Sequence, residues 1–249
     1  RAAHRADLVQ YSKPPRLSAA AGRKIPSPKK TAWTDLIFAN VKRENQRADA
    51  DAESLRISVD TKAVINLGPY SRGGLSRGLR PVAAADHDMM TKQKLVPGGI
   101  LEVQTGRPFL FFTESAKTSD FMADGIELWW RESQSRLAGT KRLVVNLDNG
   151  PECSGRRSQF LRRMVDFSTR EKLEVRLIYY PPYHSKYNGI ERYWGGLERS
   201  WNGYLLDSVA GVLLRASHFA WRSTQTTVTL LKGVYATGVK LVGKEKREL

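Results

Sequence analysis

Two short stretches decide the fold: LRISVD at residues 55–60 and LVVNLD at residues 143–148. In the first, apolar and polar residues alternate, a period that predicts a β-strand with one buried face. The second begins with a mainly apolar run that is long enough for a central strand and too short for a helix. Each stretch ends in an aspartate, Asp60 or Asp148, so both carboxylates are expected at the carboxyl ends of strands, where open α/β sheets usually bind their ligands.

The elements on either side of these strands complete an α/β pattern. They are a short helix at 33–45 followed by a polar linker at 47–53, a Gly- and Arg-rich stretch at 68–80, a hairpin of 100–104 and 109–113, helices at 119–136 and 158–172, a strand at 175–180, a long helix from residue 188, and a helix at 209–221. This order predicts an α/β fold with a mixed sheet and helices on both faces, as in ribonuclease-H-like folds. We expect a basic N-terminal arm and short helix at 1–53 and one main domain at 54–249.

The bulk composition narrows the choice of partner. A chain of 249 residues with 41% hydrophobic residues can bury one substantial core. Its 41 Lys and Arg against 25 Asp and Glu give a formal charge of +16, which points first to nucleic acid and less to an anionic membrane. No apolar run approaches the length that crosses a bilayer and no signal sequence opens the chain, so we expect an intracellular protein. Cys153 is the single cysteine, so any metal ligands should be oxygen or imidazole.

A third carboxylate, Glu191, falls in the first turn of the predicted helix that begins near residue 188. Clusters of carboxylates suit phosphodiester chemistry, because Mg²⁺ prefers carboxylate and water oxygens as ligands. Two such ions roughly 3.5–4 Å apart can clamp an in-line displacement at phosphorus. Asp60, Asp148 and Glu191 are therefore candidate metal ligands.

Each of these carboxylates also has a structural interpretation. An aspartate at the end of a strand commonly forms a turn, and Asn149-Gly150 directly after Asp148 strengthens that view. Asn188 as a helix N-cap with Glu191 three residues later resembles a capping box. The joint occurrence of the three in a ribonuclease-H-like order of elements, in a strongly basic chain, favours the metal site.

Three longer segments resemble a known family. They read SVDTK at 58–62, NLDNGPE at 146–152 and YYPPYHSKYNGIER at 179–192. These segments are similar to the three catalytic blocks of DDE transposases of bacterial insertion sequences, in particular the Azoarcus-type (Azo-thirteen) family, also labelled Rhodopirellula-type DDE transposase. The resemblance extends from Thr34 to Val242, and its long third block is far more specific than an isolated triplet.

The resemblance implies a specific activity. Asp60, Asp148 and Glu191 would form the acidic triad that holds Mg²⁺ or Mn²⁺, with two ions. The partners would be double-stranded DNA, as transposon ends and target, and further copies of the chain assembled on DNA, in the bacterial cytoplasm at the nucleoid. The function would be strand cleavage and strand transfer of an insertion sequence. The alternatives are a catalytically impaired transposase remnant that only binds DNA, and a ribonuclease-H-like nuclease.

Two departures from the family pattern stand out. Gly189 replaces the proline of the usual Asn-Pro-Ile-Glu, which loosens the start of the helix that carries Glu191. If Asn188 caps this helix, Gly189 is its first helical residue. Residues 1–30 do not resemble the helix-turn-helix module that normally precedes the catalytic domain.

Basic side chains near the triad are candidates for phosphate contacts, although each could equally be a solvated surface charge. The candidate DNA-binding residues are Lys62, Arg72, Arg77, His184, Lys186 and Arg192. Arg72 and Arg77 lie in the Gly-rich stretch, where backbone N–H groups can approach phosphate.

Two further groups have competing interpretations. Asp86-His87-Asp88 is a rival metal cluster by composition, but adjacent residues on an extended chain point in alternate directions, which favours a structural or secondary role. The tryptophans Trp129, Trp130, Trp194 and Trp201 could stack on unpaired bases. Their positions on apolar helical stripes favour packing in the core.

Overall fold

The computed structural model describes residues 32–75, 83–85, 91 and 93–241. Its main sheet is built from β1 (Ser54–Thr61), β2 (Ile65–Asn66), β3 (Lys94–Glu102), β4 (Pro108–Thr113), β5 (Arg142–Leu147), β6 (Glu174–Tyr179) and β9 (Thr227–Leu230). The helices are α1 (Ala32–Ala50), α2 (Ser119–Ser133), α3 (Ser158–Glu171), the 3₁₀ turn η1 (Ser185–Tyr187), α4 (Ile190–Ser200) and α5 (Val209–Ser217). A small hairpin of β7 (Ala220–Trp221) and β8 (Thr224–Gln225) stands apart from the sheet.

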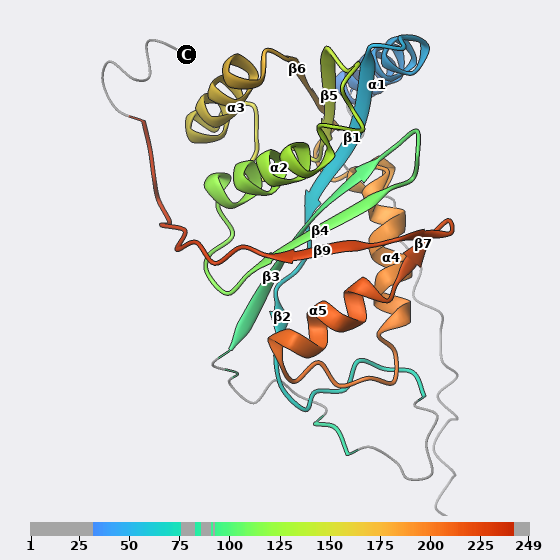
Figure 1. Cartoon of the computed structure of the whole chain (residues 1–249), viewed down its shortest axis with the longest axis vertical. Helices are drawn as coiled ribbons and strands as arrows, with labels where there is room; N and C mark the ends of the chain where they lie inside the picture. The colour runs from blue at the N-terminus through green and yellow to red at the C-terminus, as the bar shows by residue number, and fades with distance from the viewer. Residues whose placement is uncertain (1–31, 76–82, 86–90, 92, 242–249) are drawn as a thin grey trace, which may run out of the picture.

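The sheet is mixed, with the strand order β6-β5-β1-β3-β4-β9 and β2 paired to β3 (Figure 1). Strand β1 runs parallel to β5 and antiparallel to β3, and β5 runs parallel to β6. Because β1 and β5 are adjacent and parallel, their carboxyl ends meet at the same edge of the sheet. The predicted α/β fold with a mixed sheet and helices on both faces is confirmed.

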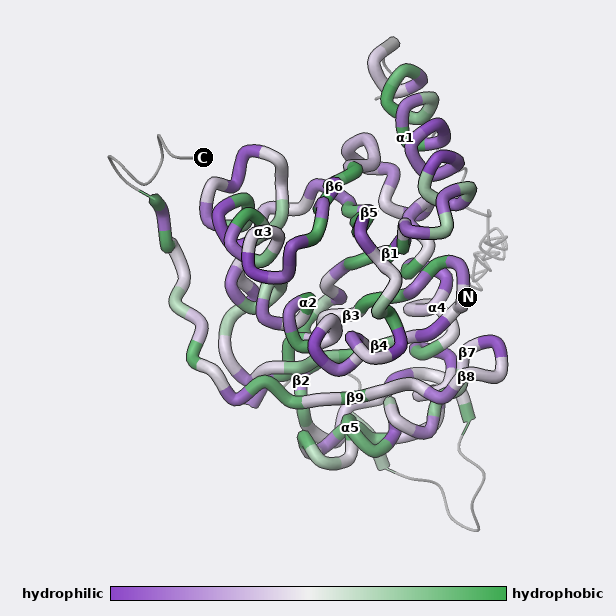
Figure 2. Tube along the Cα trace, turned by 45° about the horizontal axis from the view of Figure 1, so that its top comes forward, coloured by the Kyte–Doolittle hydropathy of each residue, from purple (hydrophilic) through white to green (hydrophobic). Residues whose placement is uncertain are grey.

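One face of the sheet packs against α2 and α3. Leu55, Ile57 and Val59 of β1 and Leu143 and Val145 of β5 are buried in this core. Their spacing of two residues puts them on one face, because side chains alternate along a strand. Figure 2 shows the apolar segments gathered on the central strands and the hydrophilic ones on the outer turns of the helices.

The other face of the sheet carries α1, α4 and α5. Ile190, Trp194 and Leu197 of α4 are buried there against Leu110 and Phe112 of β4. Helix α1 packs nearby over β5 and β6 in a smaller apolar cluster. Since both faces of the sheet are covered here, every residue of β4 is buried.

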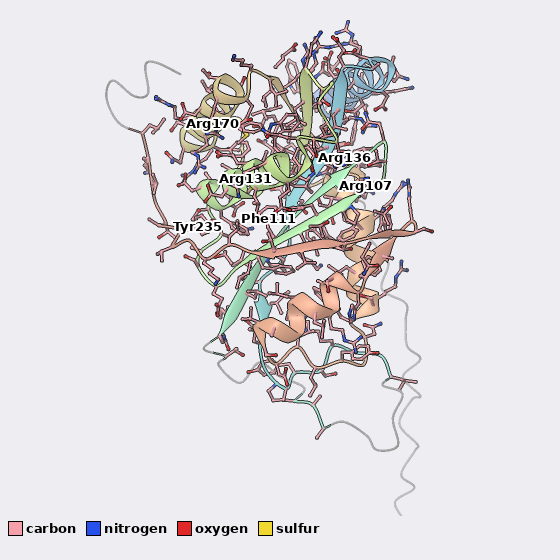
Figure 3. All side chains as sticks on the ribbon, viewed as in Figure 1. Arg107, Phe111, Arg131, Arg136, Arg170 and Tyr235 are labelled. Carbon is pink, nitrogen blue, oxygen red and sulfur yellow. The ribbon has the colours of Figure 1, made fainter. Side chains whose placement is uncertain are left out.

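Two glycines let a large ring enter the first core. A Cβ atom on Gly98 of β3 or on Gly125 of α2 would lie 2.3 Å from the Phe111 ring. The ring is therefore held between the sheet and α2, where Figure 3 labels it. Gly98 follows Pro97 in a segment whose composition is typical of a turn. This explains why the sequence prediction began the strand only at residue 100, whereas β3 begins at Lys94.

The first helix is longer than predicted. Helix α1 continues through part of the expected polar linker and ends at Ala50. Glu44 is buried and accepts hydrogen bonds from Arg47 at 3.0 Å and from Arg176 of β6 at 2.8 Å. Ala48 is buried as well. Tertiary contacts thus hold the last turns of α1, which carry no apolar stripe.

The predicted helix at 209–221 is wrong beyond Ser217. Helix α5 ends there, and the chain continues through β7 and β8 into β9. Strand β9 pairs in parallel with the outer edge of β4. Its sequence TVTL contains three β-branched residues, a strand signal in a segment to which the sequence prediction assigned no element.

Three predicted features lie outside the described residues: most of the basic arm at 1–31, Arg77, and Asp86-His87-Asp88. Among the residues that the structure describes, no helix is long and apolar enough to cross a membrane.

Candidate active site

Asp60 lies near the carboxyl end of β1 and points to the face of the sheet that carries α4. Its Oδ1 accepts a hydrogen bond from the Thr61 amide at 2.7 Å, and its Oδ2 accepts one from Trp194 Nε1 at 3.2 Å. The indole reaches the carboxylate because the neighbour of Asp60 on β3 is Gly99, which has no side chain. A Cβ atom on Gly99 would lie 2.7 Å from the Trp194 ring. Helix α4 therefore lies directly on the strand beside this carboxylate.

Asp148 follows β5 directly and begins the predicted turn. Its Oδ1 accepts a hydrogen bond from the Gly150 amide at 2.9 Å. Asn149 between them adopts φ of 65°, a left-handed conformation that asparagine tolerates better than most residues. Burial and the charge of Asp148 raise the pKa of the Cys153 thiol, which lies 3.8 Å from the same oxygen. The turn and the carboxylate site thus coexist at this position.

Glu191 lies in the first turn of α4, as predicted, but the predicted capping box is absent. The helix starts at Ile190 with Gly189 before it and has no side-chain cap from either residue 188 or 189. The Asn188 side chain instead faces β1, where its Nδ2 donates to the Val59 carbonyl at 3.2 Å. Asn188 is fully buried, and its side-chain amide bonds β1, so it does not cap the helix.

Asp148 and Glu191 act electrostatically on Asp60. Burial, followed by the negative charges of Asp148 and Glu191, raises the pKa of Asp60 to about 7. Because negative charges that lie close together repel one another, a cation bound among these carboxylates would stabilise their ionised forms. In the described part of the chain, however, no three His, Cys, Asp or Glu side chains are arranged closely enough to hold a metal ion. The donor set has the hard oxygen chemistry that suits Mg²⁺ or Mn²⁺, and the side chains would have to draw together around the ion.

Two of the predicted DNA-binding residues lie along α4. Lys62 forms an ion pair of 2.6 Å with Glu198, and its ammonium lies 6.0 Å from the Trp194 ring. Arg72 is partly buried beside the same glutamate, and its desolvation lowers the pKa of the guanidinium. A cavity of about 410 Å³ separates the Gly-rich loop from α4, and Arg72 and Arg199 contribute to its lining. This basic cavity was not predicted.

Two other predicted residues gather at the amino end of α1. His184 and Tyr187 contact the Phe38 ring at centroid distances of 5.4 and 4.8 Å. Lys186 lies over the Tyr187 ring at 5.2 Å. Arg192 of α4 is exposed. Four of the predicted basic residues thus form two groups: Lys62 and Arg72 lie around Glu198, and His184 and Lys186 lie around Phe38.

Sequence reasoning missed two residues at this site. Trp194 was assigned to the core, and it is buried, but its indole N–H also hydrogen-bonds Asp60. Glu152 lies beside Asp148, because both carboxylates come within 3.5 Å of the Cβ position of Gly150. Lys117 pairs with Glu152 at 3.1 Å. The interpretation of all four tryptophans as core residues is confirmed by burial, with exposures of 1–6%.

The fold and the carboxylates at its edge define a class of protein: a ribonuclease-H-like domain with acidic residues at the ends of β1 and β5 and at the start of α4. The chain belongs to the family described as the Rhodopirellula transposase DDE domain, whose sequence profile matches residues 16–249.

Solved structures of Mos1 transposase share this fold. The Mos1 transposase paired-end complex with left transposon end superposes with a TM-score of 0.54 at 11% identity, covering 79% of this chain and 57% of that one. The mariner Mos1 paired-end complex with Mg gives a TM-score of 0.52 at 13% identity, covering 79% and 57%. The Mos1 Strand Transfer Complex gives 0.52 at 13%, covering 79% and 56%. The chain thus spans a little over half the length of these Mos1 chains. No curated protein matches its sequence.

Proposed function

We propose that the chain is the catalytic part of a transposase that cleaves DNA at the ends of an insertion sequence and joins them to target DNA. Residues 54–249 would be the catalytic domain, and residues 1–53 a basic arm and helix that precede it. The observation that carries this proposal is the placement of the three carboxylates: Asp60 and Asp148 stand at the carboxyl ends of the adjacent parallel strands β1 and β5, and Glu191 lies in the first turn of α4, whose Trp194 bonds Asp60.

Asp60, Asp148 and Glu191 would hold two catalytic metal ions, either Mg²⁺ or Mn²⁺. When bound, such ions activate the attacking oxygen and stabilise the departing one. The protein's own groups orient the ligands: the Thr61 amide and Trp194 fix Asp60, and the Gly150 amide fixes Asp148. The fold shared with Mos1, which has been crystallised with Mg, supports this choice of metal.

The joining step would be a direct displacement at phosphorus. The 3′ oxygen of the cleaved end forms a bond to the target phosphorus, the bond from that phosphorus to its own 3′ oxygen breaks, and a proton passes from the attacking to the departing hydroxyl. No covalent enzyme intermediate is needed. Lys62, Arg72, His184, Lys186 and Arg192 would contact the DNA backbone. The protein would act as a homo-oligomer on DNA at the bacterial nucleoid.

The test is a strand-transfer assay with pre-nicked ends taken from DNA that flanks the coding sequence, incubated with Mg²⁺ or Mn²⁺ and a target plasmid. Wild-type protein should produce joined molecules. Asp60→Asn, Asp148→Asn and Glu191→Gln should each abolish joining while DNA binding persists. Asp166→Asn is the matched control, since Asp166 is an exposed aspartate of α3 paired with Arg162.

The assay also separates the alternatives. Binding without cleavage or joining would favour a remnant that only binds DNA. Metal-dependent hydrolysis without joined products would favour a nuclease. Joining that survives in any triad variant would overturn the assignment of that residue.

A further inference from the structure

We propose that Ser58 and Asn188 are positioning residues that fix the start of α4 on β1 and thereby set Glu191 relative to Asp60. This inference rests on the proposed function of the two carboxylates. Neither residue carries a charge or touches the carboxylate oxygens, so both act through the backbone to which Glu191 and Asp60 belong.

Three hydrogen bonds join the two segments. Ser58 Oγ donates to Asn188 Oδ1 at 2.5 Å and accepts from the Ile190 amide at 2.9 Å. Asn188 Nδ2 donates to the Val59 carbonyl at 3.2 Å. Ser58 and Asn188 are 0% and 1% exposed, so water does not compete for these bonds. Their polar atoms would be costly to bury if either partner were removed.

These bonds take the place of a local helix cap. The first amides of a helix have no partner inside the helix and are usually satisfied by a nearby side chain of the same segment. Here the residue before α4 is Gly189, which has no side chain to offer, and the acceptor for the Ile190 amide comes from a strand 132 residues away in sequence. The first turn of α4 is therefore anchored to β1.

The anchor lies where a small movement matters most. Ser58 and Asp60 are two residues apart on the same face of β1, which is held on both sides by β3 and β5. Glu191 directly follows Ile190, whose amide is bonded to Ser58. A shift of the helix start would thus move Glu191 while Asp60 stays with the sheet. A displacement of about 1 Å can reduce a reaction rate about 10²-fold.

The experiment measures Mn²⁺ binding to the full chain by electron paramagnetic resonance alongside single-turnover strand transfer. Ser58→Ala and Asn188→Ala should each weaken Mn²⁺ binding and slow transfer by about 10- to 100-fold, the range seen when groups that orient metal ligands are removed. DNA affinity should stay unchanged. Ser58→Thr keeps the hydroxyl and should retain wild-type Mn²⁺ affinity. If the alanine variants acted only by disturbing the packing of the core, restoring the hydroxyl would not restore Mn²⁺ affinity.

The matched control is Ser208→Ala. Ser208 Oγ accepts from the Gly211 amide at the start of α5, so its loss also removes a helix-start acceptor, but away from the carboxylates. It should lower the melting temperature without weakening Mn²⁺ binding. The double variant Ser58→Ala/Asn188→Ala should lose no more Mn²⁺ affinity than whichever single variant binds Mn²⁺ less tightly, because both residues serve one contact.

The outcomes distinguish a failure of the positioning role from a failure of the metal site. Wild-type Mn²⁺ affinity and transfer rate in both folded alanine variants would overturn the positioning role while leaving the triad intact. If one variant fails to fold, the other carries the same comparison. Wild-type protein that binds no Mn²⁺ would overturn the proposed metal site, and the positioning role with it.

Discussion

Gly189 has a backbone conformation that proline can adopt. Its φ of −56° and ψ of −35° are helical, although α4 formally begins one residue later. Asn188 before it has ψ of 128°, the extended conformation that a residue preceding proline prefers. A Cβ atom on residue 189 would lie 3.7 Å from Ser58, an ordinary contact. The departure from the family's Asn-Pro-Ile-Glu therefore has no steric cause at this residue.

Gly189→Pro should stabilise the protein by about 0.4–1 kcal/mol, because proline restricts the unfolded chain and fits the folded one. Strand-transfer activity should stay equal or rise, since the first turn that carries Glu191 becomes firmer. Thermal unfolding and the transfer assay measure the two effects. A lower melting temperature would show that the backbone at residue 189 is strained by proline and that Glu191 is not held at a relaxed helix start.

Asp60 makes the metal-free protein sensitive to pH. Its pKa is raised from 3.8 to about 7, so the folded protein holds this proton more tightly than the unfolded chain. The stabilisation that the protonated Asp60 contributes is fully present below pH 3.8 and is lost as the pH rises from 3.8 through about 7. Above that range this group no longer changes the free energy of unfolding with pH.

Asp60→Asn removes this titration. In EDTA it should raise the free energy of unfolding at pH 8 by about 1–3 kcal/mol, which allows for a weakened bond from Trp194. The gain should be smaller at pH 5. Mg²⁺ should raise the melting temperature of the wild type at pH 8 more than that of the variant. An equal change of melting temperature at both pH values would contradict the raised pKa.

The Pro97-Gly98-Gly99 segment of β3 lets helices approach both faces of the sheet. Gly98 accommodates Phe111 on the α2 side, and Gly99 accommodates α4 on the other. Glycine in a strand usually weakens it, but here the close approach compensates.

Gly99→Ala should push α4 away from β1. The new methyl group would lie 2.7 Å from the Trp194 ring and 3.0 Å from Ile190 Cδ1, so the protein should lose about 1–3 kcal/mol and the contact from Trp194 to Asp60 should weaken. Chemical denaturation and Mn²⁺ affinity report the two effects. Gly139→Ala is the control, because a Cβ atom there meets nothing within 4 Å. Unchanged stability in Gly99→Ala would mean that α4 does not lie on β3 as closely as described.

The net charge of +16 should govern DNA binding. The logarithm of affinity for duplex DNA should fall linearly with the logarithm of salt concentration, with a slope of about −0.9 for each phosphate neutralised. Lys186→Ala and Arg192→Ala should each reduce the steepness by about one such contact. Arg131→Ala removes a charge on α2, on the opposite face of the sheet, and should leave the slope unchanged (Figure 3). A wild-type slope near zero would remove the electrostatic basis for nucleic-acid binding.

The sequence alone determined the class of fold and the position of each carboxylate in its element. The alternation in residues 55–60, the apolar run before Asp148 and the stripe of α4 are local periodicities, and a local period reports which face of a strand or helix is buried. Asp60, Asp148 and Glu191 could be found in this way because each stands at the end of a periodic segment. The three blocks that resemble the transposase family are likewise continuous in sequence.

The surroundings of those carboxylates depend on tertiary contacts. Asn188 has the sequence signature of a helix cap, yet its side chain bonds β1, where its amide oxygen and nitrogen both find a partner. Trp194 has the signature of a core residue, yet its indole N–H reaches Asp60 across 134 residues of sequence. The path of the chain after α5 into β9 likewise depends on the open edge of β4. Contacts of this kind depend on which segments meet in space, and a local pattern of polar and apolar residues does not encode that meeting.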